Sequence, residues 1–296
     1  MWELLYHLPP LAAESSLSGA STIGLAATAI LTCVIEYAPL VWLHSQDLMH
    51  TIPMVNWTSI PGSQSPLTLD DLASLNSMGN TSVYLTSKEG IDANPQPHWF
   101  YGVEPSVNGV TEVFGTLDAF YFYFFAYKQG NTVLGMQLGN HVGDWEHNMV
   151  GFEQGAFTYD ATEKKGKRPI AYSANGTHAV YAIADSHDHT IPNFNLPTGL
   201  IVDYTDRGLL WDPARNAYAY SYDATSQKFQ PYDASFPVNW LEYNGKWGND
   251  ALPGGPELFG QAKYTGGPNG SRFKHLVRSK VCPRSPCTIL PKARIA

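Results

Sequence analysis

The pattern of hydrophobic and polar positions along this chain is mostly that of β-strands. Residues 117–127, LDAFYFYFFAY, alternate phenylalanine with tyrosine and form the most strand-like run. Aromatic residues favour strands, and a period of two sends one set into apolar packing and the tyrosine hydroxyls toward polar partners. We therefore predict a central core strand here. An aromatic wall for a ligand is the alternative.

Shorter runs on both sides continue the pattern. Residues 37–44, YAPLVWLH, read as a buried strand, and the turn at 129–131 leads through 132–138 into a further strand, as in a hairpin. The last third of the chain, for example AYAYSYD, alternates aromatic and polar residues between Gly, Pro, Asn and Asp turns. A helix pattern is clear at 67–79. The predicted fold is mainly β: an antiparallel two-sheet sandwich with a few short helices.

The domain organisation follows from the length of 296 residues and the lack of a linker between residues 37 and 290. We expect an atypical apolar leader at 1–36 and a single β-rich domain at 37–296. The run Ser15–Ile35 carries no charged residue, so an N-terminal membrane anchor or signal segment is one interpretation. No basic residue flanks it, which favours a short amphipathic helix or an unusual leader instead.

The charge excludes one class of partner. A formal net charge of −8 argues against nucleic acid. The residues after Glu257 are an exception, because they contain basic side chains and no acidic ones. This tail predicts a weak attraction to anionic membranes.

Cysteines and glycosylation motifs favour a secretory or vacuolar location, with a cytoplasmic one as the alternative. Cys282 and Cys287 enclose four residues and can form a small disulfide loop, which leaves Cys33 over. Four Asn-x-Ser/Thr motifs predict a glycoprotein, at Asn56, Asn80, Asn175 and Asn269.

The candidate chemistry is concentrated in one stretch, GNHVGDWEH at 139–147. If it forms a strand, Asp144 and Glu146 project from one face, while Trp145 and His147 project from the other. Two like charges about 6–7 Å apart on one face are unfavourable without a cation or strong donors. The pair therefore indicates a site.

His141 is the third candidate, because a turn at Asn140 and Gly143 can direct its imidazole back toward Asp144. One imidazole with two carboxylates predicts a divalent-cation site, for Mg²⁺, Mn²⁺ or Ca²⁺ more than for Zn²⁺. The alternative is that the carboxylates are hydrogen-bonded or paired with Lys or Arg, although few of these occur nearby in sequence before Lys164.

His187 and His189 form a second polar cluster. On an extended segment they share one face, as two ligands of one metal do, but a polar loop that satisfies its own turn explains them equally well. Serine hydrolase, phosphate-loop and dinucleotide-binding motifs are absent from the sequence.

The same stretch carries a family resemblance. GNHVGDWEHNMV resembles the hallmark of a fungal family, that of vacuolar protein sorting-associated protein 62, and the similarity extends over most of 37–287, including NPQPHWFYG and HDHTIPNFNLPTGLIVDYTDRGLLWDP. It implies a role in vacuolar protein sorting and brings no assigned reaction.

A shorter similarity concerns the chemistry. His-x-x-Asp-Trp-Glu resembles the metal-binding heptapeptide of necrosis- and ethylene-inducing toxin-like proteins, a β-sandwich family that binds sphingolipid glycans. By that match His141, Asp144 and Glu146 fall on metal positions. His178 is implicated as well, because that family uses a histidine after a comparable strand near its metal.

Two apparent deletions set the chain apart from the family, around Val113–Gly115 and between Phe152 and Tyr159. The second would remove a strand or loop beside the site. Either the site is reshaped for another ligand, or the chain is a decayed or misassembled copy.

Two functions follow from these expectations. The first is a divalent-metal-binding protein of the vacuolar sorting or secretory pathway that binds a lipid headgroup, a glycan or another small molecule. The alternative is a metal-dependent hydrolase or cyclase/lyase of fungal secondary metabolism, in which Glu146 or His147 moves a proton beside a Lewis-acidic metal.

Overall fold

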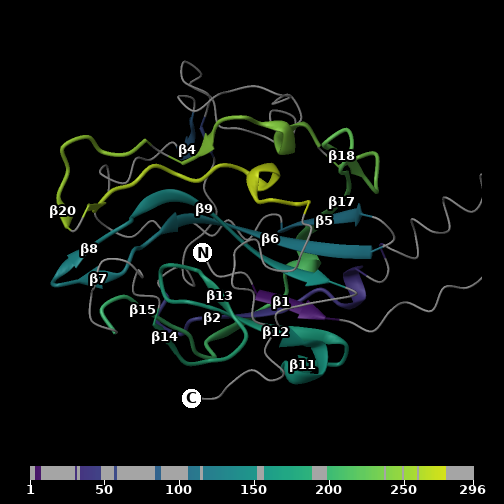
Figure 1. Ribbon diagram of the computed structural model, residues 1–296, viewed down its shortest axis with the longest axis horizontal. Coiled ribbons are helices and arrows are strands. Elements are labelled where there is room, and N and C mark those ends of the chain that lie inside the picture. The colour runs from purple at the N-terminus through teal and green to yellow at the C-terminus, as the bar shows by residue number, and fades with distance from the viewer. Residues whose placement is uncertain are drawn as a thin grey trace, which may run out of the picture.

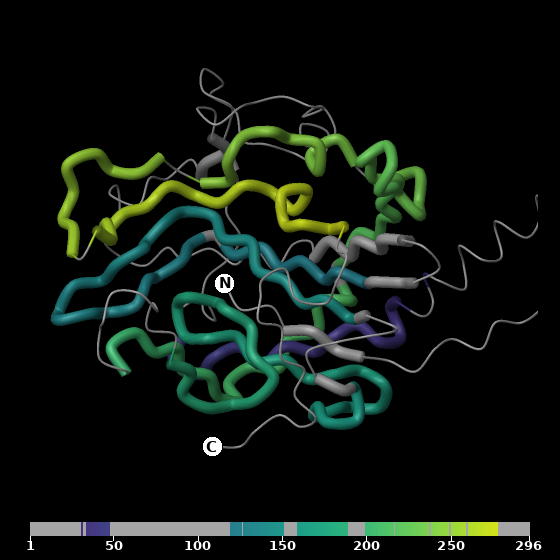
Figure 2. Tube along the Cα trace, in the orientation of Figure 1, coloured from purple at the N-terminus to yellow at the C-terminus, as the bar shows by residue number. Residues whose placement is uncertain are grey.

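The computed structural model describes residues 4–7, 31, 34–47, 57–58, 84–87, 106–113, 116–151, 157–188, 199–236, 238–248, 250–258 and 260–277 (Figure 2). Several predictions lie outside these ranges: the helix at 67–79, His189, the three cysteines, most of the apolar leader, and the glycosylation motifs at Asn56 and Asn80. Within the described residues, no helix is long and apolar enough to cross a membrane.

A seven-stranded sheet forms the middle of the molecule (Figure 1). Its strands, in spatial order, are β10 (Phe157–Thr158), β1 (Leu4–His7), β9 (His141–Gly151), β6 (Thr116–Lys128), β5 (Ser106–Val113), β17 (Ala217–Asp223) and β18 (Lys228–Pro231). The long β5–β6–β9 unit is antiparallel. β1, from the leader, pairs in parallel with β9 and β10.

A five-stranded sheet lies on one side of the large sheet. It consists of β11 (Lys164–Lys165), β12 (Arg168–Ser173), β2 (Leu40–Leu43), β16 (Leu209–Trp211) and β13 (Val180–Tyr181).

The described residues also include helical residues at 34–36, several short strands and four 3-10 helices. The remaining strand pairings are β14 (Ser186–Asp188) with β15 (Val202–Tyr204), β4 (Tyr84–Ser87) with β3 (Trp57–Thr58) and β19 (Lys246–Trp247), β20 (Glu257–Leu258) with β21 (Gln261–Ala262), and β7 (Thr132–Val133) with β8 (Met136–Gln137). The 3-10 helices are η3 (Tyr159–Ala161), η4 (Pro213–Asn216), η5 (Asn239–Glu242) and η6 (Ser271–Phe273).

β6 is the central strand that the alternation predicted. One set of its side chains packs toward the five-stranded sheet: Ala119, Tyr121, Tyr123 and Phe125. The tyrosine hydroxyls find polar partners, since Tyr121 donates to the Val34 carbonyl at 2.7 Å and Tyr123 donates to Asn148 Oδ1 at 2.8 Å.

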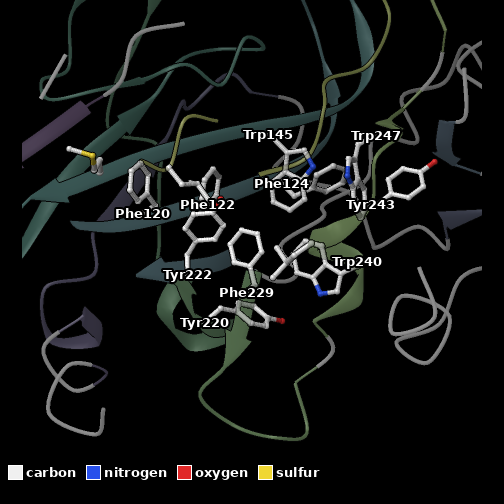
Figure 3. Packing of buried hydrophobic residues seen from close by; sticks show 13 residues of the cluster. Phe120, Phe122, Phe124, Trp145, Tyr220, Tyr222, Phe229, Trp240, Tyr243 and Trp247 are labelled. Carbon is white, nitrogen blue, oxygen red and sulfur yellow. The ribbon is translucent and has the colours of Figure 1, made fainter. Parts of the chain in front are cut away.

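The opposite face of the large sheet is covered by the C-terminal part of the chain, coloured green to yellow in Figure 1. Figure 3 shows the aromatic cluster between them, in which Phe124 and Trp145 from the sheet meet Trp240 and Trp247. Trp145 stacks on Trp240 at 5.9 Å and contacts Phe124 at 4.8 Å between ring centroids.

The prediction of a mainly β chain with a few short helices is confirmed. Several pairings are parallel, including β2 with β12 and β5 with β17, so the sheets are mixed rather than wholly antiparallel. The two-sheet sandwich stays a prediction, because the large sheet is covered on both of its faces.

Candidate functional site

β9 presents the two predicted carboxylates on one face. Asp144 lies opposite Phe125 and Glu146 lies opposite Tyr123 in the antiparallel register with β6, on the side of the five-stranded sheet. Trp145 projects into the aromatic cluster on the other side. The predicted division of faces is therefore confirmed, and both carboxylates are buried.

His141 approaches Asp144 as predicted. Gly143 has φ +72°, a left-handed conformation that glycine adopts readily. The His141 ring turns back at this point, so that its Nδ1 lies 2.7 Å from the Gly143 carbonyl and its Nε2 lies 4.0 Å from Asp144 Oδ1. Because a carbonyl oxygen can only accept, Nδ1 carries the proton and Nε2 keeps its lone pair in the neutral ring.

The neutral form of His141 is favoured by its surroundings. Burial, the largest influence, and the nearby Lys128 charge lower the pKa of His141 against the opposing attraction of Asp144. His141 therefore has an uncharged nitrogen directed at a carboxylate.

His178 bridges two carboxylates. Its ring stacks on Phe125, with centroids 4.0 Å apart and planes 3° from parallel. Nδ1 lies 3.5 Å from Asp144 Oδ2, and Nε2 lies 3.3 Å from Asp47 Oδ2. Burial disfavours the charged ring, but Asp47 and Asp144 outweigh it and raise the pKa of His178 to about 9.

The turn that carries His178 is held by buried hydrogen bonds. Asp203 accepts from Thr177 Oγ1 at 2.8 Å and from the Tyr181 hydroxyl at 2.7 Å. The backbone N–H of Gln129 donates a hydrogen bond to the Gly176 carbonyl oxygen at 2.8 Å. These bonds fix the turn against the end of β6, so the position of the His178 ring is set by residues from three segments.

Asp144 and Glu146 have opposite pKa shifts. Burial opposes ionisation of Asp144, but Lys128, followed by His178 and His141, lowers its pKa to about 2. Burial and then the Asp144 charge raise the pKa of Glu146 to about 7. One carboxylate of the pair is therefore ionised while its neighbour keeps a proton to near neutral pH.

Two predicted residues lie elsewhere. His147 is on the other face of β9 from Glu146, stacked on Phe122 at 5.1 Å, because consecutive strand residues alternate sides. His147 therefore lies on the face away from the two carboxylates, and its role in proton transfer stays a prediction. His187, on β14, stacks on Tyr181 at 3.7 Å, and its Nε2 lies 3.0 Å from Thr205 Oγ1.

Sequence reasoning missed three charged neighbours of the site. Asp47 follows the buried strand β2, but it lies far in sequence from the motif at 139–147, and no local pattern links the two. Lys128 directly follows the predicted strand run at 117–127 and is the last residue of β6, where the hairpin places it opposite His141. Asp203 carried no local signal, since its partners come from distant parts of the chain.

These residues are of the chemical types that bind divalent cations, but the distances between their ligand atoms are longer than those in a metal site. Within the described ranges, no group of three or more His, Cys, Asp or Glu side chains is arranged to hold a metal ion. The 4.0 Å between His141 Nε2 and Asp144 Oδ1 exceeds the roughly 3 Å expected between adjacent ligands with bonds of about 2.1 Å. Asp144 Oδ2 is buried and faces His178 Nδ1 at 3.5 Å, so a cation at this oxygen would compete with the His178 ring.

Two yeast proteins resemble the chain along most of its length. "Putative vacuolar protein sorting-associated protein TDA6" of Saccharomyces cerevisiae is 32% identical over 84% of this chain and 68% of its own length. Vacuolar protein sorting-associated protein 62 of the same organism is 33% identical over 70% of this chain, which spans about half of that relative, 53%. No family model and no solved structure matches the chain. On the strength of these relatives, the chain belongs to the family of vacuolar protein sorting-associated protein 62.

Proposed function

We propose that this chain binds a divalent cation through His141, Asp144 and Glu146, and that the cation helps to hold a lipid headgroup or glycan in vacuolar protein sorting. The family supports the vacuolar or secretory role. The cation and its ligand are the proposal. The observation that carries it is the pairing of a neutral imidazole nitrogen with a buried, ionised carboxylate at 4.0 Å.

The hydrogen bond of the His141 ring supports a role for this residue as a metal ligand. Histidines that bind metals commonly donate their second ring N–H to a carbonyl or carboxylate, which fixes the tautomer and the ring orientation. The Nδ1 of His141 makes this bond to the Gly143 carbonyl, so Nε2 is available on the side of Asp144.

Glu146 supplies the second carboxylate. A cation would have to displace its proton and draw Asp144 and His141 together by about 1 Å, as ligand spacing requires. When bound, a divalent cation offers a Lewis-acidic contact for phosphate or sugar hydroxyl oxygens. His178 lies between Asp47 and Asp144 and orients the carboxylate of Asp144.

The first test removes one ligand charge. We expect Asp144→Asn to weaken Mg²⁺, Mn²⁺ or Ca²⁺ binding by roughly 100-fold, as loss of a charged ligand implies. EDTA should lower the melting temperature of the wild type and leave that of Asp144→Asn unchanged, because bound metal stabilises the folded state only where it binds. Isothermal titration calorimetry and thermal denaturation measure the two effects.

Asp160→Asn is the matched control, since Asp160 is exposed and the change in charge is the same. It should bind metal and respond to EDTA as the wild type does. An equal EDTA response in wild type and Asp144→Asn, or no calorimetric binding of any of the three ions, would contradict the proposal.

The bound ligand requires a separate measurement. We expect retention on lipid-headgroup or glycan arrays to fall when EDTA is added, and to fall equally without EDTA in Asp144→Asn. Retention that EDTA does not change would mean that the ligand binds without the metal.

A metal-dependent enzyme is the second candidate, favoured by one observation. Asp144 and Glu146 lie on one face with pKa values of about 2 and about 7, and such separated pairs are suited to acid–base chemistry. Glu146 would then move the proton. Metal-stimulated turnover of a phosphodiester or glycoside panel by the wild type, lost in Glu146→Gln, would favour the enzyme over the binding protein.

A further inference from the structure

Asp47 joins the candidate site from outside the stretch at 139–147. It follows β2 and is buried. Its Oδ2 atom lies 3.3 Å from His178 Nε2 and accepts a hydrogen bond from the Gly176 backbone N–H at 3.4 Å. One carboxylate therefore contacts both the ring of His178 and the turn that carries this residue.

The backbone of His178 has an unusual conformation. Its φ is +57°, in the left-handed region that is uncommon for residues other than glycine. Such conformations persist where the surrounding structure enforces them, and they are frequent at functional sites. Here the His178 backbone N–H donates to the Ala174 carbonyl at 3.1 Å, and the ring stacks on Phe125 with centroids 4.0 Å apart. The turn thus directs the imidazole between the two sheets.

The two ring nitrogens of His178 face carboxylates on opposite sides. Nε2 faces Asp47, and Nδ1 lies 3.5 Å from Asp144 Oδ2. Because carboxylate oxygens only accept, a ring with an N–H on both nitrogens suits both contacts. His178 therefore connects the carboxylate of Asp47 to that of Asp144.

This connection leaves one oxygen of Asp144 for a cation. Oδ2 faces His178, whereas Oδ1 lies 4.0 Å from His141 Nε2. If the His178 ring turned away, the carboxylate of Asp144 could rotate and lose this orientation. Groups that orient the ligands of a metal matter for affinity, and their removal commonly weakens binding by roughly 10- to 100-fold.

We propose that Asp47 is a positioning residue of the candidate metal site: through His178, it fixes the carboxylate of Asp144 so that Oδ1 faces His141 and a divalent cation. The inference rests on the proposed function, since it concerns the same site. It adds to that function a residue that acts on the cation only through another side chain.

The experiment measures the binding of Mg²⁺, Mn²⁺ and Ca²⁺ by isothermal titration calorimetry in the wild type, Asp47→Asn, His178→Asn and the double variant. Asparagine is chosen at position 178 because it tolerates the left-handed backbone. Asp47→Asn should weaken binding by roughly tenfold, and His178→Asn by a similar factor. The double variant should bind no more weakly than His178→Asn, because Asp47 acts through that ring.

Asp206→Asn is the matched control. Asp206 accepts a hydrogen bond from the Ser45 backbone N–H at 2.6 Å, in the same segment as Asp47. The substitution removes the same charge beside this segment and leaves the His178 ring and both of its carboxylates unchanged. Asp206→Asn should therefore bind the ions as the wild type does.

A second measurement follows the His178 ring in EDTA. The stacked Phe125 ring shifts the NMR signals of the His178 ring protons upfield. We expect this shift to decrease in Asp47→Asn, because the ring loses one of its two carboxylate partners, and to persist in Asp206→Asn. A purely structural role of Asp47 would lower thermal stability without changing cation affinity.

The outcomes separate this inference from the proposed function. Cation binding by the wild type with unchanged affinity in Asp47→Asn overturns the role of Asp47 and leaves the metal site intact. Additive losses in the double variant, an unchanged His178 signal in Asp47→Asn, or equal weakening by Asp206→Asn would also overturn it. No binding by the wild type overturns both. Asp47→Ser replaces Asp47→Asn if that variant does not unfold cooperatively.

Discussion

Asp144 and Glu146 are neighbours on one face of β9, yet their carboxyl groups lose protons at very different pH. Both are buried, so the difference comes from partners rather than from solvent exposure. At Asp144, Lys128 and His178 outweigh the effect of burial, whereas at Glu146 burial and the negative charge of Asp144 outweigh Lys128 and Lys274. At the residue scale, the site is therefore a pair of carboxyl groups that together carry between one and two negative charges at neutral pH.

The raised pKa of Glu146 predicts that the stability of the folded state depends on pH. Folded Glu146 keeps its proton to about pH 7, while the unfolded side chain loses it near 4.5. The folded state therefore binds more protons in between, and stability should fall as pH rises from 4.5 to 7, by roughly 3 kcal/mol. In EDTA, Glu146→Gln should lose much less stability over this range by urea denaturation. Parallel curves for the two proteins would contradict the assignment.

The second scale is that of β9 and the C-terminal segment packed behind it. Gly143 lies where the two meet: a Cβ added there would lie 2.5 Å from the Trp247 carbonyl oxygen, and its φ is +72°. Gly248 and Gly267 make similarly close approaches to the Val142 carbonyl. Glycines on both segments thus let the backbone behind the site pack at a distance that any side chain would prevent.

Two glycine-to-alanine variants distinguish the cost of backbone strain from the cost of a steric clash. Gly139 also has a positive φ, +83°, but a Cβ there would meet nothing within 4 Å. Gly139→Ala should cost about 1–2 kcal/mol of unfolding free energy from backbone strain, and Gly143→Ala should cost clearly more because it adds a clash with Trp247. Urea denaturation measures both. Equal losses would mean that the close packing against Trp247 is not maintained in solution.

In the whole molecule, the large sheet is enclosed on both faces, and charged contacts anchor the C-terminal segment. Arg272 Nη1 lies 3.1 Å from Glu242 Oε2 and donates to the Glu242 carbonyl at 3.0 Å. Glu242 is buried, so removal of Arg272 would leave its charge poorly compensated, with Lys228 at 3.7 Å as a more exposed partner.

Arg272→Met should therefore destabilise the molecule by roughly 2–4 kcal/mol, below the full cost of breaking a buried pair because Arg272 is partly exposed. Arg215→Met is the control. Arg215 pairs with Asp212 at 3.5 Å on the surface, so its substitution should lower the free energy of unfolding by less than about 1 kcal/mol.

Tryptophan fluorescence and circular dichroism should report one shared unfolding transition. A separate early fluorescence transition would mean that the C-terminal segment unfolds independently.

The sequence by itself determined which residues form strands and which faces they present. The Phe–Tyr alternation of 117–127 and the Asp-Trp-Glu order at 144–146 specify two-residue periodicity, and the period is a local property of extended backbone. The approach of His141 to Asp144 was equally predictable, because Gly143 lies between them and permits the left-handed turn.

Only the tertiary structure decided what surrounds the carboxylates. Asp47 and His178 join Asp144 from segments about 97 and 34 residues away, and Asp203 orders their turn from further along the chain. Such contacts depend on which strands pair, and parallel pairings such as β2 with β12 have no signature in local periodicity. Alternation sets the direction of a side chain, whereas its partners are set by packing between distant segments, which no local pattern encodes.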